Sequence, residues 1–189
     1  VAARFVLDFN GKKIAVYSVH LPTPRRSLAH VVSARALAEM FWLAHAPTDG
    51  FPSYRAWLNA RVDLARKLAA AFDKEKLPCI VGGDFNMPDH GTLYHTFASG
   101  LTDAHARVGH GWGLTFPGTR EGGVAGLLGA WLRLDYWFSN PGWEPIECRV
   151  VEEIEKLSLE LRCHRRIADE PEGCFLGEIE LSGIQTRLT

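Results

Sequence analysis

Two polar residues follow a short apolar run near the middle of the sequence. Asp84 and Asn86 stand two residues apart, after the run Cys79–Val81 and the pair Gly82-Gly83. In an extended backbone, side chains two residues apart face the same side. A carboxylate there can accept a proton or bind a metal ion, an amide can orient a ligand, and the glycines let a substrate approach closely. The same residues also suit a turn in which the Asp side chain caps the backbone, and the residue types alone leave both interpretations open.

A histidine and two arginines form a second candidate. His20 ends the apolar run Lys13–His20, and Arg25 and Arg26 follow it closely. A single His at the end of a strand is often a structural residue. Two guanidinium groups just beyond it favour a phosphate-binding site instead, since arginine holds phosphate oxygens through paired hydrogen bonds. His20 is therefore a candidate catalytic residue, and Arg25 and Arg26 are candidate substrate-binding residues.

An acidic residue interrupts a third apolar run, Leu132–Phe138. Asp135 lies at its centre. A charged side chain inside an apolar strand costs free energy unless it is paired or bound to something. A structural explanation, such as capping a neighbouring loop, stands beside a functional one in which Asp135 supports a site.

These residues need a scaffold of strands and helices. Segments 4–9 and 13–20 have strand-like patterns and meet at Asn10-Gly11, a dipeptide typical of a tight hairpin turn. Both faces of the second segment are largely apolar, which predicts a strand covered on both sides. Helical spacing of apolar residues covers 27–45 and 54–72, with a break rich in Pro and Gly between them.

The second half of the chain alternates in the same way between strands and helices. Strands are expected at 79–81, 131–139, 147–151 and 174–181, and a short helix at 93–97. Because strands and helices interleave, the expected fold class is α/β or α+β, in a single domain that spans 1–189.

The composition describes a globular chain with almost no net charge. Of the 189 residues, 47% are hydrophobic and 23% are charged, and 21 Lys and Arg face 22 Asp and Glu. A protein that grips duplex DNA without sequence preference usually has a basic excess. A small phosphoester or a lipid headgroup is therefore slightly favoured over nucleic acid as the substrate, although a local basic groove would still admit DNA.

Cysteine spacing argues against a zinc or dithiol site, and the lengths of the apolar runs argue against a transmembrane segment. The four cysteines lack the CxxC spacing of a zinc or dithiol site. No stretch has the length of a transmembrane segment, and no signal peptide opens the chain, which starts at Val1. The cellular compartment and the oligomeric state are not indicated.

Taken together, four segments resemble the endonuclease/exonuclease/phosphatase (DNase I-like) superfamily, which includes nucleases, sphingomyelinases and inositol-phosphate phosphatases. Val16–Leu21 looks like the family's strand ending in His-Leu, and Val81–Asn86 looks like its Gly-Asp-Phe-Asn motif. Gly113–Pro117 and Leu132–Tyr136 look like its Thr-Phe-Pro loop and Arg-Ile-Asp-Tyr strand. The order and spacing agree from about residue 4 to residue 151.

The resemblance implies a four-layer α/β/β/α sandwich with a divalent metal, Mg²⁺ or Mn²⁺, at one edge of two packed sheets. Hard cations prefer oxygen ligands, so Asp84 and Asn86 are the implied metal ligands. By the same resemblance, Asp84 places or activates the attacking water and Asn86 orients a ligand. His20 donates to a phosphate oxygen as charge grows in the transition state, and Asp135 supports the site.

Two departures from the family pattern stand out. Family members have an N-terminal half that supplies a metal-binding Glu, and no such segment precedes Arg4, so residues 1–189 are expected to be the C-terminal part of the domain. The family also ends with Ser-Asp-His, and the nearest match is Cys163–Ala168, which makes His164 a candidate catalytic residue with Cys in place of Asp. An alternative alignment anchors on 174–181, places Glu170–Glu172 at the motif and leaves no His.

The expected activity is metal-dependent hydrolysis of a phosphoester by activated water, as in a phosphodiesterase, a phosphatase or a nuclease. One alternative is a non-catalytic domain that retains the fold, and another is a fragment that does not fold alone. For residues 1–189 by themselves we expect weak or absent activity and a tendency to aggregate, because truncating a two-sheet sandwich exposes apolar surface and strand edges.

Overall fold

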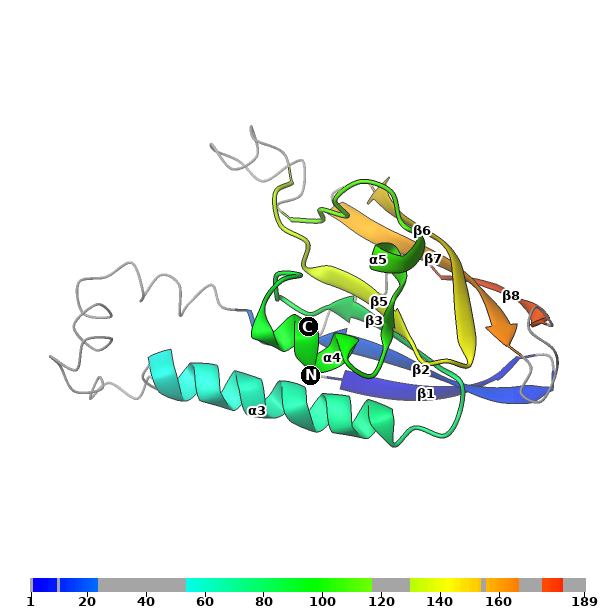
Figure 1. The fold of residues 1–189 in the computed structure, drawn as a ribbon, viewed down its shortest axis with the longest axis horizontal. Coiled ribbons are helices and arrows are strands. Elements are labelled where there is room, and N and C mark those ends of the chain that lie inside the picture. The colour runs from blue at the N-terminus through cyan, green and yellow to red at the C-terminus, as the bar shows by residue number, and fades with distance from the viewer. Residues whose placement is uncertain are drawn as a thin grey trace, which may run out of the picture.

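The structure is a computed structural model, and it describes residues 2–9, 11–23, 54–116, 130–153, 156–166 and 175–181 (Figure 1). Within these residues the strands form two sheets. Sheet A has the strand order β1-β2-β3-β5-β4, with β1 (Ala2–Phe9), β2 (Lys12–His20), β3 (Cys79–Asp84), β4 (Thr102–Asp103) and β5 (Asp135–Ser139). Sheet B has the order β6-β7-β8, with β6 (Trp143–Glu153), β7 (Lys156–Arg166) and β8 (Phe175–Leu181). The described helices are α3 (Tyr54–Asp73), α4 (Thr92–Ala98) and α5 (Ala104–Val108).

The hairpin predicted at the start of the chain is confirmed. β1 and β2 are antiparallel, and the pairing of Phe9 with Lys12 leaves a two-residue turn. Gly11 has a φ of 78°, a left-handed conformation that glycine adopts readily. The Gly11 amide also donates a hydrogen bond of 2.8 Å to Asp8 Oδ1, which stabilises the turn and so the register of β2.

The direction of β3 decides where the strand ends meet. β3 runs parallel to β2, and its last residue, Asp84, pairs with His20. On its other side β3 runs antiparallel to β5, so that Asp84 also pairs with Asp135, the first residue of β5. The ends of β2 and β3 and the beginning of β5 therefore lie together at one edge of sheet A.

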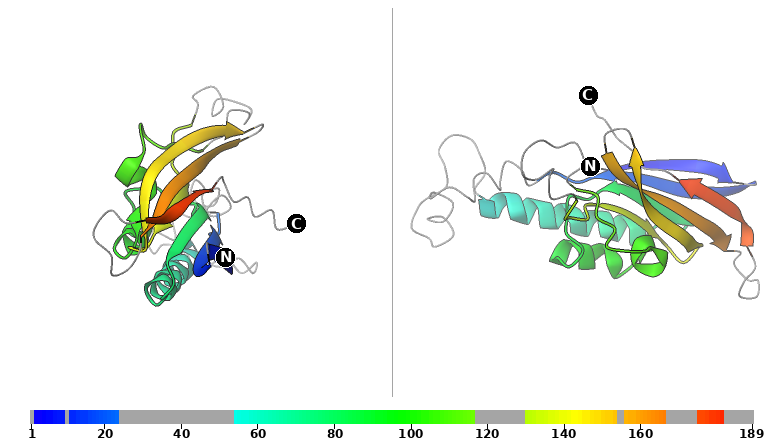
Figure 2. Two further views of the ribbon diagram at one scale, coloured as in Figure 1. Left: turned by 90° about the vertical axis from the view of Figure 1, so that its right-hand side faces the viewer. Right: turned by 90° about the horizontal axis from the view of Figure 1, so that it is seen from above.

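β2 is buried on both faces, as its sequence pattern predicts. Ala15, Tyr17 and Val19 pack in the core that α3 and α4 cover. Ile14 and Val16 pack on the opposite face, against residues of sheet B. Figure 2 shows the same order of layers, with α3 on one side of sheet A and the long strands of sheet B on the other. The mixed α/β class is confirmed, whereas the complete four-layer arrangement stays a prediction.

Helix α3 confirms the helical pattern predicted for 54–72. Ala65 and Phe72 are buried against sheet A, and Leu64 and Leu68 pack partly against the same core. Seven residues separate Ala65 from Phe72, which is two helical turns and puts them on one face. The helix predicted for 27–45 lies outside the described residues.

Most of the other elements follow the sequence pattern, but the strands β4 and β7 and the short helix α5 were not predicted. The expected strands 147–151 and 174–181 and the helix 93–97 correspond to β6, β8 and α4. The strand expected at 131–139 begins only at Asp135, because Leu132 makes an isolated bridge to Phe116 instead of continuing the ladder. β7 was not predicted, although it pairs along its length with β6 and along much of it with β8.

Candidate functional site

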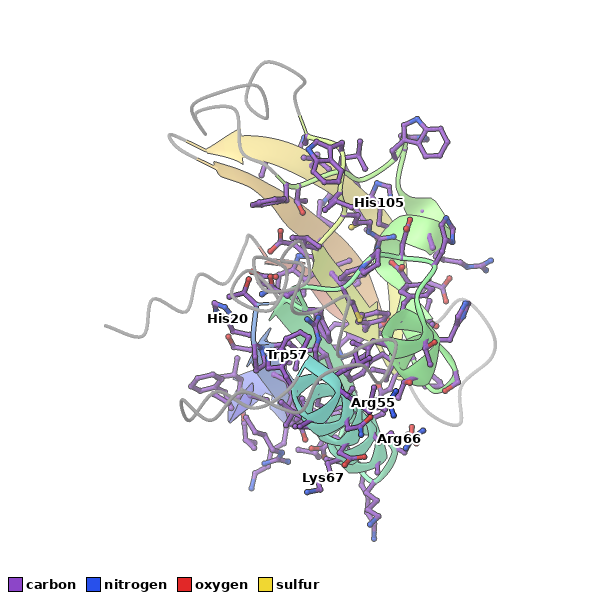
Figure 3. All side chains as sticks on the ribbon, turned by 90° about the vertical axis from the view of Figure 1, so that its left-hand side faces the viewer. His20, Arg55, Trp57, Arg66, Lys67 and His105 are labelled. Carbon is purple, nitrogen blue, oxygen red and sulfur yellow. The ribbon has the colours of Figure 1, made fainter. Side chains whose placement is uncertain are left out.

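Three of the residues singled out by the sequence occupy one row of sheet A. His20, Asp84 and Asp135 are neighbours on adjacent strands, and we call these three residues the strand-end row. Directly opposed residues on neighbouring strands bring their side chains close together. Figure 3 looks at the molecule from this end, and His20 projects there from β2. The row combines two carboxylates and an imidazole from three separate segments of the chain.

Two glycines allow β3 to end at this position. A Cβ atom at Gly82 would overlap the ring of Trp137 on β5. Gly83 has a φ of 138°, and a Cβ atom there would overlap the carbonyl oxygen of Val19 on β2. Only glycine fits both the backbone conformation and the close approach of β2. The glycine pair therefore serves strand packing, and it places Asp84 at the tip of β3.

The backbone turns immediately after Asp84. The Asn86 amide donates a hydrogen bond of 2.8 Å to Asp84 Oδ1, the side-chain capping turn that is typical of Asp. Asn86 has a φ of 49°, in the left-handed region. The extended backbone that would place Asp84 and Asn86 on one side is therefore absent. The structural interpretation of this motif as a capped turn is correct, and it leaves the functional one open.

The side chain of Asn86 fastens this turn to the end of β2. Asn86 Nδ2 donates a hydrogen bond of 2.9 Å to the carbonyl oxygen of Leu21, the residue after His20. In return, the Leu21 amide donates a hydrogen bond of 2.9 Å to the carbonyl oxygen of Asp84. His20 and Asp84 are thus held in register beyond the last strand pair.

The carboxyl group of Asp84 lies in an unfavourable environment for its charge. Burial raises the pKa of Asp84 above its ordinary value. The hydrogen bond from the Asn86 amide and the charges of His20 and Arg61 act in the opposite direction, but they do not outweigh burial. A cation bound beside this carboxylate would therefore stabilise its ionised form.

Asp135 is positioned by the loop that precedes it. Thr115 Oγ1 accepts hydrogen bonds from the amides of Leu134 and Asp135, at 3.2 and 3.3 Å. Thr115 belongs to the Thr-Phe-Pro segment, whose Phe116 bridges to Leu132. The hydroxyl replaces a strand partner at the point where β5 begins, so Thr115 orients the backbone that carries Asp135.

Behind Asp135 lies a buried ion pair that supports β5. Arg133 Nη2 donates to Asp103 Oδ1, and both side chains are almost completely buried. Tyr94 donates a hydrogen bond of 2.9 Å to the other oxygen of Asp103. The Arg133 guanidinium also lies 4.4 Å from the centroid of the Tyr136 ring. A buried pair of this kind depends on such additional contacts, because desolvation opposes it.

One further residue contacts the turn from outside the motifs. Arg61 of α3 is buried, and its Nη2 donates to the carbonyl oxygens of Phe85 and Asn86. Arg61 lies outside all the sequence motifs. Its sequence signal is a charge four residues before Ala65, on the helix face that packs against the sheet.

The sequence as a whole matches the Endonuclease/Exonuclease/phosphatase family over residues 3–157. The match includes nearly all of sheet A and the turn after Asp84. The chain belongs to this family. The match begins near the start of the chain and lends no support to the expectation that residues 1–189 are the C-terminal part of the domain. No curated protein matches the sequence.

Solved structures of the endonuclease/exonuclease/phosphatase type resemble the chain at low sequence identity. A family protein from Leptotrichia buccalis is 18% identical with a TM-score of 0.46, and the match covers 86% of this chain and 53% of that one. A family protein from Bacteroides thetaiotaomicron is 17% identical with a TM-score of 0.45, covering 79% and 44%. Sphingomyelinase C from Streptomyces griseocarneus is 16% identical with a TM-score of 0.46, covering 95% and 52%. The chain spans about half the length of these structures.

One predicted site residue, His164, lies away from the strand-end row. His164 lies on β7 of sheet B, where it pairs with Glu144 and Glu178. Glu144 stands at the beginning of β6, just after the turn that follows the far end of β5. The backbone thus places His164 at the opposite end of β5 from Asp135. Arg25 and Arg26 lie outside the described residues.

Side chains at and next to the row offer oxygen atoms of the kind that a hard cation prefers. Asp84 and Asp135 offer carboxylate oxygens in adjacent register, and Asn86 offers an amide oxygen, all of which suit a hard cation. Within the described ranges, no group of three His, Cys, Asp or Glu residues is close enough to hold an ion. In the same part of the chain, no helix combines the length and apolar character that a membrane crossing requires.

Proposed function

We propose that the protein carrying this chain hydrolyses phosphoesters with an activated water molecule at the strand-end row. The observation that carries the proposal is the meeting of His20, Asp84 and Asp135 in one row of a family member's sheet. These residues come from three motifs that the sequence resemblance associates with one site. Neither the hairpin nor the packing of β3 requires all three residue types at that edge.

Each side chain has a proposed role that its position allows. Asp84 places or deprotonates the attacking water, since a carboxylate with a raised pKa is a better base than an exposed one. The imidazole of His20, which is exposed at the end of β2, donates a hydrogen bond to a phosphate oxygen as negative charge develops. Asp135 supports the row from β5. Asn86 orients the ligand, and its side chain also fastens the turn to Leu21.

The proposal includes a divalent cation, Mg²⁺ or Mn²⁺. Asp84 and Asn86 would supply part of its oxygen ligands, and Asp135 is close enough in register to contribute. When bound, such an ion neutralises phosphate charge and lowers the pKa of a coordinated water. Without it, the ionised form of Asp84 is opposed by burial.

For the substrate, we propose a small phosphoester or a lipid headgroup before nucleic acid. The support is the charge balance of the chain, with 21 Lys and Arg against 22 Asp and Glu. Binding to duplex DNA draws its free energy mainly from phosphate neutralisation by cationic side chains, which this balance does not favour.

The test is a substrate panel with the full-length protein. A phosphomonoester, a phosphodiester, a lipid phosphodiester and duplex DNA are each assayed with Mg²⁺, with Mn²⁺ and with a chelator. We expect turnover of at least one small or lipid phosphoester that disappears with the chelator. Turnover of no phosphoester under any of these conditions would reject the proposal, and turnover of DNA alone would reject the substrate preference.

The placement of His164 favours one alternative, a non-catalytic domain that retains the fold. The family resemblance assigns the last motif histidine a role on the nucleophile, but His164 lies at the far end of β5 from the row. The same substrate panel decides this alternative, which predicts no turnover although the protein is folded.

A further inference from the structure

Arg61 is a charged residue on the face of α3 that packs against sheet A. Ala65, four residues later, and Phe72, eleven residues later, lie on the same face, and both are buried. Arg61 itself is only 5% exposed. A helix needs no cation at such a position for packing, and burying a guanidinium group is unfavourable unless its donors are satisfied. The contacts that satisfy Arg61 therefore indicate its role.

Two of the hydrogen bonds of Arg61 are made to the turn after Asp84. Arg61 Nη2 donates a hydrogen bond of 3.2 Å to the carbonyl oxygen of Phe85, and it also donates to the carbonyl oxygen of Asn86. The guanidinium carbon lies 5.4 Å from the centroid of the Trp57 ring, one helical turn earlier. Figure 3 shows Trp57 at the end of the molecule at which His20 projects. One cation thus reaches two consecutive carbonyl groups next to the strand-end row.

The turn needs such a partner because the strand ladder has ended. β3 stops at Asp84, and Asn86 adopts a left-handed conformation, which Asn tolerates better than most residues other than glycine. Phe85 and Asn86 are both buried, so carbonyl groups without a donor there would be costly. The two hydrogen bonds from Arg61 stabilise the conformation in which the Asn86 amide reaches Asp84 Oδ1.

We propose that Arg61 is a positioning residue for the hydrolytic site, which acts by fixing the turn that carries Asp84 and Asn86. This inference rests on the proposed function, since it assigns Arg61 to that same site. In this role Arg61 acts through the turn rather than by contact with the substrate. It holds the backbone of the two residues that follow Asp84, so that the carboxylate and the Asn86 side chain keep one arrangement.

The kinetic test compares three variants of the full-length protein. Arg61→Met removes the donors, Arg61→Lys keeps the charge, and Arg66→Met is the control from the exposed side of α3, with an Arg66 side chain that is 70% exposed. With bis(p-nitrophenyl) phosphate and Mg²⁺, we expect Arg61→Met to lower kcat roughly 100-fold and to change KM little, because misplaced catalytic groups act mainly on the transition state. Arg61→Lys should retain an intermediate kcat, and Arg66→Met should match the wild type.

A second measurement does not depend on turnover. Amide hydrogen exchange reports the hydrogen bond from Asn86 to Asp84, and Val81 in the middle of β3 serves as the internal reference. We expect Arg61→Met to speed exchange at Asn86 about tenfold or more, since local opening exposes that amide, while Val81 stays protected. If Arg61→Met does not fold, Arg61→Gln is measured in the same way.

The outcomes separate the two proposals. A folded Arg61→Met or Arg61→Gln protein with wild-type kcat, or with wild-type exchange at Asn86, overturns the role of Arg61. A lower melting temperature without either change would show that Arg61 only joins the helix to the sheet. If the wild-type protein has no metal-dependent turnover, the proposed function fails, and exchange at Asn86 still decides whether Arg61 orders the turn.

Discussion

Two carboxyl groups near β2 and β3 have pKa values that are shifted in opposite directions. Glu75, in the segment between α3 and β3, accepts hydrogen bonds from Arg4 Nε at 2.7 Å and from the Tyr17 hydroxyl at 2.6 Å. The amide of Leu77 donates a third, of 3.0 Å. These donors, Arg4 first, lower the pKa of Glu75 to about 2. At Asp84, burial raises the pKa instead.

The difference distinguishes a structural carboxylate from one that is available for a ligand. We call Arg4, Tyr17 and Glu75 the Glu75 cluster. There the protein provides the counter-charge and three donors, so the cluster is complete without any other molecule. The Asp84 carboxyl accepts a hydrogen bond from the turn, but the protein does not offset its burial. Perturbed carboxyl groups of this second kind often belong to functional sites.

Removing Asp84 should have the largest effect on activity. For Asp84→Ala in the full-length protein, we expect kcat with a phosphodiester and Mg²⁺ to fall on the order of 10²–10⁴-fold, the range for losing a general base. Asp63→Ala, which removes an exposed acid from α3, is the matched control and should leave kcat unchanged. Near-normal turnover of Asp84→Ala would refute the role of Asp84.

Removing Glu75 should have the opposite consequence from removing Asp84: it should lower stability and leave kcat unchanged. Glu75→Ala should lower the free energy of unfolding by about 1–2 kcal/mol, because the donors from Tyr17 and Leu77 lose their acceptor. Urea denaturation measures the change, and Lys74→Ala at an exposed neighbouring position is the control. A large loss of kcat in a folded Glu75→Ala protein would contradict the purely structural role of the Glu75 cluster.

The pH dependence of stability should come partly from the Glu75 cluster. In the unfolded chain the pKa of Glu is about 4.3, so the unfolded state binds the proton first as the pH falls. The stabilisation is therefore complete above about pH 5 and is lost as the pH falls towards 2. Between pH 6 and pH 3, the urea midpoint of unfolding should fall less in Glu75→Gln than in the wild type. Parallel pH profiles of the two proteins would contradict the lowered pKa.

The smallest expected effect is a gain in stability at the strand-end row. Asp84→Asn removes a partly buried negative charge, and its amide oxygen can still accept the hydrogen bond from Asn86. At neutral pH we expect a slight rise in melting temperature, measured in the presence of a chelator, together with loss of turnover measured with Mg²⁺. A fall in melting temperature would mean that the Asp84 charge is already compensated within the protein.

The hairpin could be predicted from local patterns and the row from the family resemblance, but the residues that support the row could not. Period-two apolar patterns and the Asn10-Gly11 turn predict the hairpin, and the motif order places His20, Asp84 and Asp135 together. β7 has the same signal, since Leu157, Leu159, Leu161 and Cys163 alternate with polar residues.

The contacts of Arg61 and Thr115 could not be predicted, although Thr115 lies in the Thr-Phe-Pro segment and Arg61 is a charge on the packed face of α3. Each acts on a segment about twenty residues or more away, through hydrogen bonds to backbone groups that any sequence would have. The left-handed conformation of Asn86 was missed for a related reason. Side chains two residues apart share one face only where the backbone stays extended. β3 ends at Asp84, so the rule does not reach Asn86.

The strand-end row also determines when the site can form during folding. The hairpin of β1 and β2 needs only a two-residue turn, and such local structures form within microseconds. The pairs that join His20 to Asp84 and Asp84 to Asp135 connect segments far apart in the sequence, and such contacts carry a large loop-closure entropy. We therefore expect the hairpin to form first, which gives a period in which β2 is made but its parallel neighbour is absent. During that period the apolar faces of β2 are exposed to other chains, so a slow-folding variant is expected to lose yield by association before it loses activity per folded molecule.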